Sequence, residues 1–163
     1  TLFLIHSYMY GVKKLTFIPD VLYHYSLRSS SQIHNMNMQD IENLKKYLLV
    51  TKENAIKQGI YEEFKYCLDE MAFLHLGISW MHMVSYDKSV KMQELLKDTT
   101  RYLDKEFPTW RKSKFFKMSH CFPKGIKFIG IWGVHLLYRM GLPIIYIWGY
   151  KFLVEKLHIV IKW

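Results

Sequence analysis

The sequence predicts a mainly α-helical protein, and three observations lead to this fold class. Apolar residues recur every three to four positions through most of residues 38–104, which is the spacing of an amphipathic helix. The same spacing returns after Lys124, in a more apolar part of the chain. Only residues 15–26 have a composition typical of β structure. We therefore expect one helix and a short β segment, then three helices, then two C-terminal amphipathic helices.

The N-terminal part of the chain is expected to hold a helix at residues 1–10 and a β segment at residues 15–26. Apolar residues at helical spacing, followed by Gly11, predict the helix. The β segment starts with an apolar run, turns at Pro19-Asp20 and continues with aromatic and β-branched residues, which favour strands. This pattern fits two strands or one bent strand.

Three helices are expected next, at residues 38–58, 61–83 and 88–104. Asn37 and Asp87 are residue types that cap helix N-termini, and they precede the first and the third helix. Gly59 is expected to end the first helix, and Pro108 closes the third. Apolar residues surround the second half of the middle helix, so we expect it at the centre of a three-helix bundle.

Candidate metal ligands are few and scattered. Cys67 and Cys121 lie far apart and form no Cys-x-x-Cys pair, which favours a reducing compartment and argues against a zinc knuckle. His75 and His82 can share one helix face, but neither a carboxylate nor a thiolate accompanies them. His6 has no second ligand at helical spacing. We interpret His75 and His82 as core or groove residues and His6 as a partly buried helix residue, and we expect no metal site here.

The net charge of +9 is concentrated in the last third of the chain. Residues 111–163 contain ten Lys and Arg against one Glu, whereas residues 1–110 contain 13 basic and 13 acidic residues. Basic, apolar and aromatic residues together are typical of a segment that meets an anionic membrane surface. Nucleic acid is the competing anionic partner, but a tail that binds it rarely carries so much aliphatic surface. We expect a membrane partner for residues 111–163 and no nucleic acid.

Two C-terminal helices are expected on either side of Gly141-Leu142-Pro143, because helices commonly end at a Gly that is closely followed by Pro. Most of their residues are apolar, and the polar residues of each helix fall on one narrow stripe. The stripe of the first helix contains Lys124, Lys127, His135 and Arg139, and that of the second contains Lys151, Glu155, His158 and Lys162.

These polar stripes bear on how the two helices meet a bilayer. About 20 apolar residues are needed to cross one, and residues 126–150 reach that length only with Lys127, His135, Arg139 and Pro143 inside. An Arg near the bilayer centre costs roughly 2.5–3.5 kcal/mol. We favour two helices that lie in the membrane interface. A re-entrant hairpin and helices that dock on a preceding catalytic domain are the alternatives.

One motif in the chain resembles a known family. The order of residues is Pro19-Asp20-x-Leu22-Tyr23-x-Tyr25-x-x-Arg28-x-x-Ser31. It resembles the motif that closes the catalytic domain of bacterial family-two glycosyltransferases with a GT-A fold. Residues 1–5 resemble the start of the helix that precedes this motif in the family, and Pro108-x-Trp110 with the basic residues after it resembles an element found beyond the helices. The resemblance covers residues 1–33 by motif and the remainder by general layout.

The resemblance implies a donor-binding role for two residues. Arg28 and Ser31 would contact the diphosphate of the nucleotide-sugar donor, because a guanidinium donates two parallel hydrogen bonds and a hydroxyl adds one. Tyr23, His24 and Tyr25 would position that loop. The sequence departs from the family at Ser26, where many members have Arg, and at Gln32, and both departures weaken the assignment. Without the resemblance, the same segment is a solvated loop after an edge strand.

The resemblance also implies groups that this sequence does not contain. The family binds a divalent cation, Mg or Mn, through an Asp-x-Asp motif and uses a carboxylate base near a Glu-Asp pair. We therefore expect a C-terminal fragment that is inactive alone and binds no cation itself, and the absence of an initiator Met fits this expectation. Its parts would be the end of a truncated GT-A domain (1–34), a helical bundle (35–107) and a basic, apolar, membrane-associating tail (108–163).

The function expected from the resemblance is glycosyl transfer by the full-length parent. A sugar would pass from a nucleotide-sugar donor to a polysaccharide or lipid-linked acceptor at the cytoplasmic face of the bacterial membrane, where the enzyme is peripheral. The alternative is a non-enzymatic helical adaptor or interaction module at a membrane surface.

Overall fold

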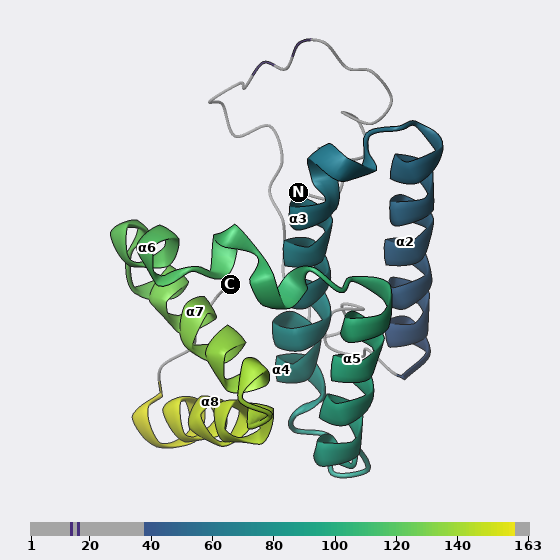
Figure 1. Cartoon of the computed structure of the whole chain (residues 1–163). Helices are drawn as coiled ribbons and strands as arrows, with labels where there is room; N and C mark the ends of the chain where they lie inside the picture. The colour runs from purple at the N-terminus through teal and green to yellow at the C-terminus, as the bar shows by residue number, and fades with distance from the viewer. Residues whose placement is uncertain (1–13, 15, 17–37, 159–163) are drawn as a thin grey trace. The chain divides into compact units, whose positions relative to one another are not determined.

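The computed structural model describes residues 14, 16 and 38–158. The helix expected at residues 1–10 and the β segment expected at residues 15–26 lie outside the described residues, apart from Thr16, which is in no helix or strand. Within the described part, the chain forms helices and turns and no strand (Figure 1). The prediction of a mainly α-helical protein is therefore confirmed.

The chain divides into two compact units, residues 1–62 and residues 63–163. Helix α2 (Met38–Lys57) belongs to the first unit, and the helices from α3 onward lie almost entirely in the second. The three-helix bundle therefore stays a prediction, because its first helix and its third helix are in different units.

Helix α2 is amphipathic, as its sequence predicts. Its buried side chains follow one face, and they are Ile41, Leu48, Thr51 and Ala55. After Lys57 the chain turns at Gly59, whose φ of 71° suits glycine better than any residue with a Cβ. The N–H of Ile60 donates to the carbonyl of Ala55 at 3.0 Å, which satisfies an end group of the helix. Gly59 is thus confirmed as the stop.

A long helix of mixed geometry forms the core of the second unit. It consists of α3 (Tyr61–Ala72), the π-helical segment η2 (Phe73–Ser79) and α4 (Trp80–Val84). In the π segment the helix is wider, and the N–H of Trp80 accordingly donates to the carbonyl of His75, five residues back. The sequence predicts the long helix but not its π-helical middle.

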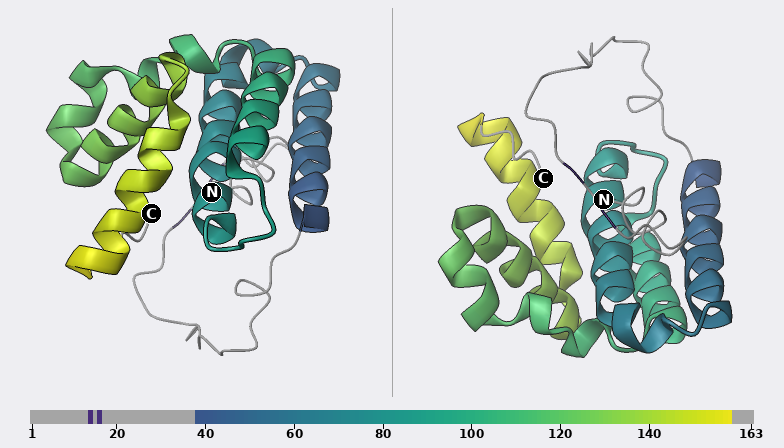
Figure 2. Two further views of the ribbon diagram at one scale, coloured as in Figure 1. Left: turned by 90° about the horizontal axis from the view of Figure 1, so that it is seen from below. Right: turned by 90° about the horizontal axis from the view of Figure 1, so that it is seen from above.

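Helix α5 (Met92–Glu106) runs beside the π segment (Figures 1 and 2). It starts four residues later than predicted, because Asp87 caps a turn and not the helix. The Asp87 carboxylate accepts hydrogen bonds from the backbone N–H and the hydroxyl of Ser89, at 2.9 and 2.7 Å. The buried side chains of α5 are Leu95, Leu96, Thr99 and Leu103.

Short turns connect α5 to two final helices. The turns are η3 (Trp110–Lys112), η4 (Lys114–Phe116), α6 (Met118–Cys121) and η5 (Phe122–Lys124). Helices α7 (Ile126–Arg139) and α8 (Pro143–Leu157) follow, and α8 lies against α4 and α5 (Figure 2). Gly141, with φ of 76°, ends α7, and Pro143 is the first residue of α8. The predicted boundary between the two helices is confirmed.

Aromatic rings join these elements around Phe73 of the π segment. The Phe73 ring stacks on Trp110 with centroids 5.1 Å apart, and it meets the rings of Phe116, His135 and Tyr138 edge to face at 5.0 to 5.3 Å. Such pairs add stabilisation to the burial of apolar area. The second unit is therefore centred on a cluster to which η2, η3, η4 and α7 each contribute.

Candidate functional site

The residues that the family resemblance assigns to donor binding lie outside the described residues. They are Arg28 and Ser31, with Tyr23, His24 and Tyr25 as positioning residues. Their roles stay predictions, and the described part of the chain contributes a different kind of candidate site.

Two tyrosine hydroxyls fasten the last two helices to the π segment. Tyr138 of α7 donates to the carbonyl of Gly77 at 2.8 Å, and Tyr146 of α8 donates to the carbonyl of Ile78 at 3.2 Å. Burial raises the pKa of both phenols well above the ordinary range, so both stay protonated donors. The faces of α7 and α8 that pack on the rest of their unit therefore carry tyrosines whose hydroxyls are hydrogen-bonded.

His135 does not lie on the exposed polar stripe predicted for α7. Its side chain is buried, with Nε2 3.1 Å from the carbonyl oxygen of Trp110 and the ring stacked on Phe116 at 4.4 Å. Burial is the main reason that its pKa falls to about 4. Burying a neutral imidazole costs little free energy when it has a backbone hydrogen-bond partner and aromatic neighbours. The predicted stripe of α7 is therefore wrong at His135.

Trp110 is also a core residue. Its indole N–H donates to Asp104 at 2.9 Å, and the Arg111 guanidinium donates to the same carboxylate at 2.7 and 2.9 Å while lying 4.6 Å over the indole. The hydrogen bond from Arg111 is the main reason that the pKa of Asp104 lies below its ordinary value. The segment predicted to be either a family element or a basic surface loop is anchored by a buried Trp, while Lys112 and Lys114 remain exposed.

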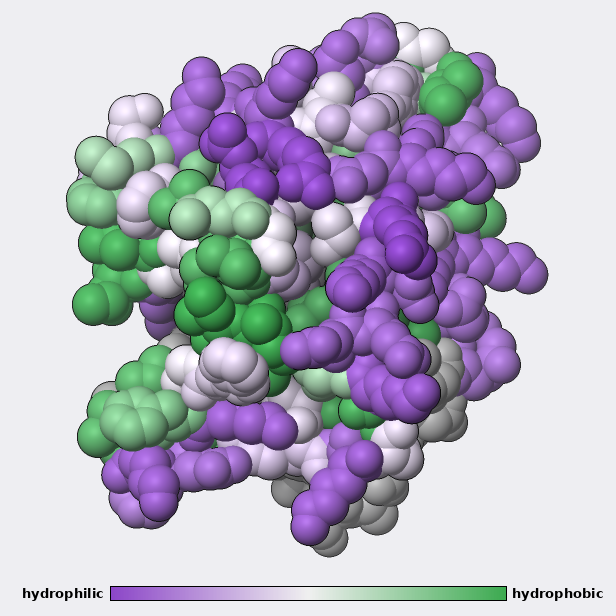
Figure 3. Space-filling model, turned by 60° about the horizontal axis from the view of Figure 1, so that its bottom comes forward, coloured by the Kyte–Doolittle hydropathy of each residue, from purple (hydrophilic) through white to green (hydrophobic). Residues whose placement is uncertain are grey.

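The outward surface of the last two helices and their turn is unusually apolar. The exposed large apolar residues there are Ile126, Met140, Leu142, Ile145, Trp148, Phe152 and Leu157. On α8, Ile145, Trp148 and Phe152 share one face, and Trp148 and Phe152 are 62% and 57% exposed. Figure 3 shows hydrophobic residues gathered on the side where α7 and α8 lie. We call these seven residues the apolar surface, and patches of this kind mark sites of interaction.

Exposed cations accompany the apolar surface. Lys127 and Arg139 lie at the two ends of α7, and Lys156 lies in the last turn of α8. Lys151 is half-buried, with its ammonium 5.4 Å over the ring of Tyr86, and Lys162 lies outside the described residues. Across the described ranges, no helix combines the length and the apolar character that a membrane crossing requires.

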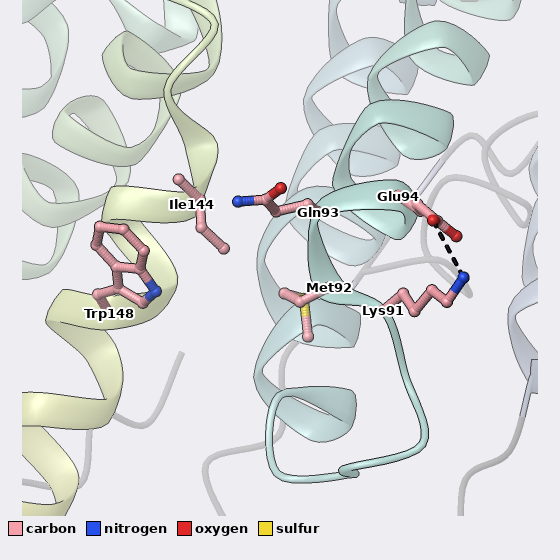
Figure 4. A pocket seen from close by; sticks show the side chains of 6 residues that line it. All are labelled: Lys91, Met92, Gln93, Glu94, Ile144 and Trp148. Carbon is pink, nitrogen blue, oxygen red and sulfur yellow. Dashed lines mark hydrogen bonds and ion pairs between the residues drawn. The ribbon is translucent and has the colours of Figure 1, made fainter.

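A groove of about 440 Å³ separates the start of α5 from α8. Figure 4 shows Ile144 and Trp148 of α8 on one side, with Met92 and Gln93 of α5 across from them. The ion pair of Lys91 and Glu94, at 3.4 Å, lies at the end of the groove away from α8. The sequence did not predict this groove, because its two walls are some fifty residues apart.

The histidines of the long helix are in the interior or half-buried. His82 stacks on Tyr150 with ring centroids 3.7 Å apart, and burial lowers its pKa to about 4. His75 is half-buried, and its pKa is also lowered, mainly by burial. In the residues that the structure describes, no three His, Cys, Asp or Glu side chains gather as they would around a metal ion.

Comparison of the chain with protein-family models, with curated protein sequences and with solved structures found no match.

Proposed function

We propose that this chain is the C-terminal part of a membrane-associated bacterial glycosyltransferase and that its last helices hold the enzyme at the cytoplasmic face of the membrane. The motif from Pro19 to Ser31 supports the enzyme class. The observation that carries the membrane role is the exposed row of Ile145, Trp148 and Phe152 on α8.

The energetics of this surface favour contact with lipid. Transferring an exposed large apolar side chain from water to an apolar environment contributes about 1.5–3 kcal/mol. A Lys or Arg near an anionic leaflet adds about 1 kcal/mol. The binding free energy is therefore sufficient for reversible binding in the plane of the interface, with the charges left in water. It comes from the apolar side chains of Trp148 and Phe152 and from the cations of Lys127 and Lys156.

In the full-length enzyme, Arg28 and Ser31 would bind the diphosphate as negative charge accumulates on the leaving nucleotide. Tyr23, His24 and Tyr25 would hold that loop in place. The divalent cation, Mg or Mn, and the carboxylate base would come from parts of the enzyme that this sequence does not contain. The acceptor would be a polysaccharide or a lipid-linked glycan, which a membrane-bound enzyme meets at the surface where such lipids lie.

Vesicle binding tests the membrane role. Trp148→Ser/Phe152→Ser should weaken co-sedimentation of this chain with phosphatidylcholine–phosphatidylglycerol vesicles by more than tenfold, because it removes the largest exposed apolar groups. Met83→Ser is a matched control, since Met83 of α4 is 42% exposed and is not part of the apolar surface. Equal binding by the double variant and the control would remove α8 from the membrane contact. Membrane binding through apolar groups should also survive added salt better than nucleic-acid binding does.

The enzyme class is tested separately. The coding DNA upstream of Thr1 should encode a Glu-Asp pair and, farther back, Asp-x-Asp, and Arg28→Ala in that full-length enzyme should lower turnover by more than tenfold. Unchanged kinetics would exclude Arg28 from the donor site. A stop codon followed by a start codon near Thr1 would favour the alternative, a non-enzymatic membrane-surface adaptor.

A further inference from the structure

A second hollow, of about 410 Å³, opens where α5 meets the turn between α7 and α8. Four cationic side chains line it: Lys97 and Arg101 from α5, Arg111 from η3, and Arg139 from the end of α7. Among the described residues that line the hollow, none is an Asp or a Glu. Chain folding thus brings together positive charges from three elements that are distant in sequence.

The four cations differ in how far they are already neutralised. Arg111 is fixed by its two hydrogen bonds to Asp104 and retains N–H groups for a further acceptor. Arg101 pairs with Asp98 at 3.0 Å, but both side chains are largely exposed, and such pairs contribute little. In the described ranges, Lys97 and Arg139 make no ion pair. The hollow therefore retains unneutralised positive charge.

The geometry of the hollow also favours an anion. Lys97 and Arg101 are four residues apart on one helix face, where like charges repel each other, and the largely exposed Asp98 beside Arg101 offsets only part of that repulsion. Pro143, which lines the hollow, is the first residue of α8, so the positive end of the helix dipole lies there. Guanidinium groups can each offer two parallel donors to phosphate oxygens. Phosphate is the anion that best fits several arginines.

The turn that lines the hollow also belongs to the apolar surface. Met140 is 61% exposed and is one of the lining residues, and Leu142 follows in the same turn. A ligand with a phosphate and an adjoining hydrocarbon chain would satisfy both features, whereas a free phosphate would leave the apolar residues in water. We propose that this hollow binds the phosphate headgroup of an anionic membrane lipid, an inference that rests on the proposed membrane association.

The experiment measures binding of the whole chain to vesicles of phosphatidylcholine, with and without phosphatidylglycerol. Lys97→Gln/Arg101→Gln should weaken binding to the anionic vesicles by more than tenfold, and Arg139→Gln alone should weaken it severalfold. The matched control is Lys88→Gln/Lys105→Gln, which removes the same charge at exposed positions outside the hollow. Equal losses in the two double variants would mean that only net charge matters, and the site would be rejected.

Two further arms separate the possible failures. If wild-type chain binds neutral vesicles and the anionic lipid adds nothing, the headgroup site is refuted while the membrane association stands. If neither kind of vesicle binds, the proposed membrane association itself fails. Inorganic phosphate tests whether the hollow binds a soluble phosphate and not a lipid headgroup. If it binds the chain in the absence of vesicles and also displaces the chain from anionic vesicles, the lipid assignment is overturned. The expected result is no displacement by inorganic phosphate.

These substitutions are suited to the purpose because Lys97, Arg101 and Arg139 are all exposed. Arg111 is left intact, since its removal would strip Asp104 of its partner. Circular dichroism should show unchanged helicity in every variant, and Arg139→Lys should restore part of the binding that Arg139→Gln loses.

Discussion

The hydroxyl of Tyr138 in α7 donates a 2.8 Å hydrogen bond to the carbonyl oxygen of Gly77 in the π-helical segment η2. Gly77 permits this close approach: a Cβ added there would lie 3.0 Å from atoms of the Phe73 ring and 3.6 Å from Cζ of Tyr138. The glycine, the tyrosine and the widened helix therefore depend on one another. The hydrogen bond thus ties α7 to the π segment, and the bond from Tyr146 to the carbonyl of Ile78 makes the same kind of link for α8.

Tyr138→Phe should lower the free energy of unfolding by about 0.5–1.5 kcal/mol, because the buried carbonyl of Gly77 loses the hydrogen bond from the Tyr138 hydroxyl without a change in ring packing. Tyr150→Phe is the control, since the Tyr150 hydroxyl makes no hydrogen bond within the described part of the chain. Urea unfolding followed by circular dichroism measures both. Equal stabilities of the two variants would show that the bond to Gly77 contributes nothing.

Gly77→Ala should destabilise the protein by about 1–3 kcal/mol, although alanine ordinarily favours a helix over glycine by about 1 kcal/mol. The reason is that the Phe73 ring, which is fully buried among four other rings, has no room to move away. Gly133→Ala in α7 is the control, because a Cβ added to Gly133 would have no atom within 4 Å. That variant should gain stability in thermal unfolding, and a gain of the same size at Gly77 would contradict the packing.

Stability should fall as the pH drops from about 6.5 toward 4, because His135 has its pKa lowered to about 4 in the folded chain. The unfolded state takes up a proton on this ring at a higher pH than the folded state does. The contribution of the neutral ring to the free energy of unfolding is therefore complete above the unfolded pKa and is lost as the pH falls below it. His82, whose pKa is also about 4, acts in the same direction. The midpoint of urea unfolding, measured across this pH range, reports the loss.

His135→Gln should reduce this pH dependence, since the amide can keep a hydrogen bond to the carbonyl of Trp110 but does not titrate. A pH profile of the His135 variant identical to that of the wild type would exclude His135 as the responsible group.

Asp104→Asn should cost up to about 1 kcal/mol, a modest effect because the pair with Arg111 is partly exposed and screened by solvent. The pKa of the Asp104 carboxyl is lowered, chiefly by the hydrogen bond from Arg111, so its contribution is present above the ordinary carboxyl pKa and disappears as the pH falls below it. Asp98→Asn removes the largely exposed pair with Arg101 and should change stability little. Thermal unfolding of the two variants in low and high salt measures how much each ion pair contributes to stability.

Local chemistry made several features predictable from the sequence. Gly59 and Gly141 end helices because their backbones adopt positive φ, and Pro143 starts α8 because its fixed φ suits a first turn. The long helix is predicted by its apolar period. By contrast, Asp87 was expected to cap α5, but it caps the turn before it, since the same carboxylate can satisfy either set of N–H groups.

The basic hollow and the position of His135 could not be predicted in the same way. Helical periodicity groups His135 with Lys127 and Arg139, yet the aromatic cluster buries His135 and leaves Arg139 exposed. Lys97, Arg111 and Arg139 are each ordinary basic residues in the sequence, and only the packing of α7 on the π segment brings them to one hollow.

The sequence by itself determined that the described chain is helical, where α2 and α7 end, and that its last third is basic and apolar, because those properties depend on neighbouring residues and on composition. Only the tertiary structure decided which faces of α7 and α8 are buried, where the helix widens, and which cations share a hollow. Those outcomes depend on contacts between residues some sixty positions apart, such as Tyr138 with Gly77, and a periodic pattern along one helix contains no information about the partner that will cover it.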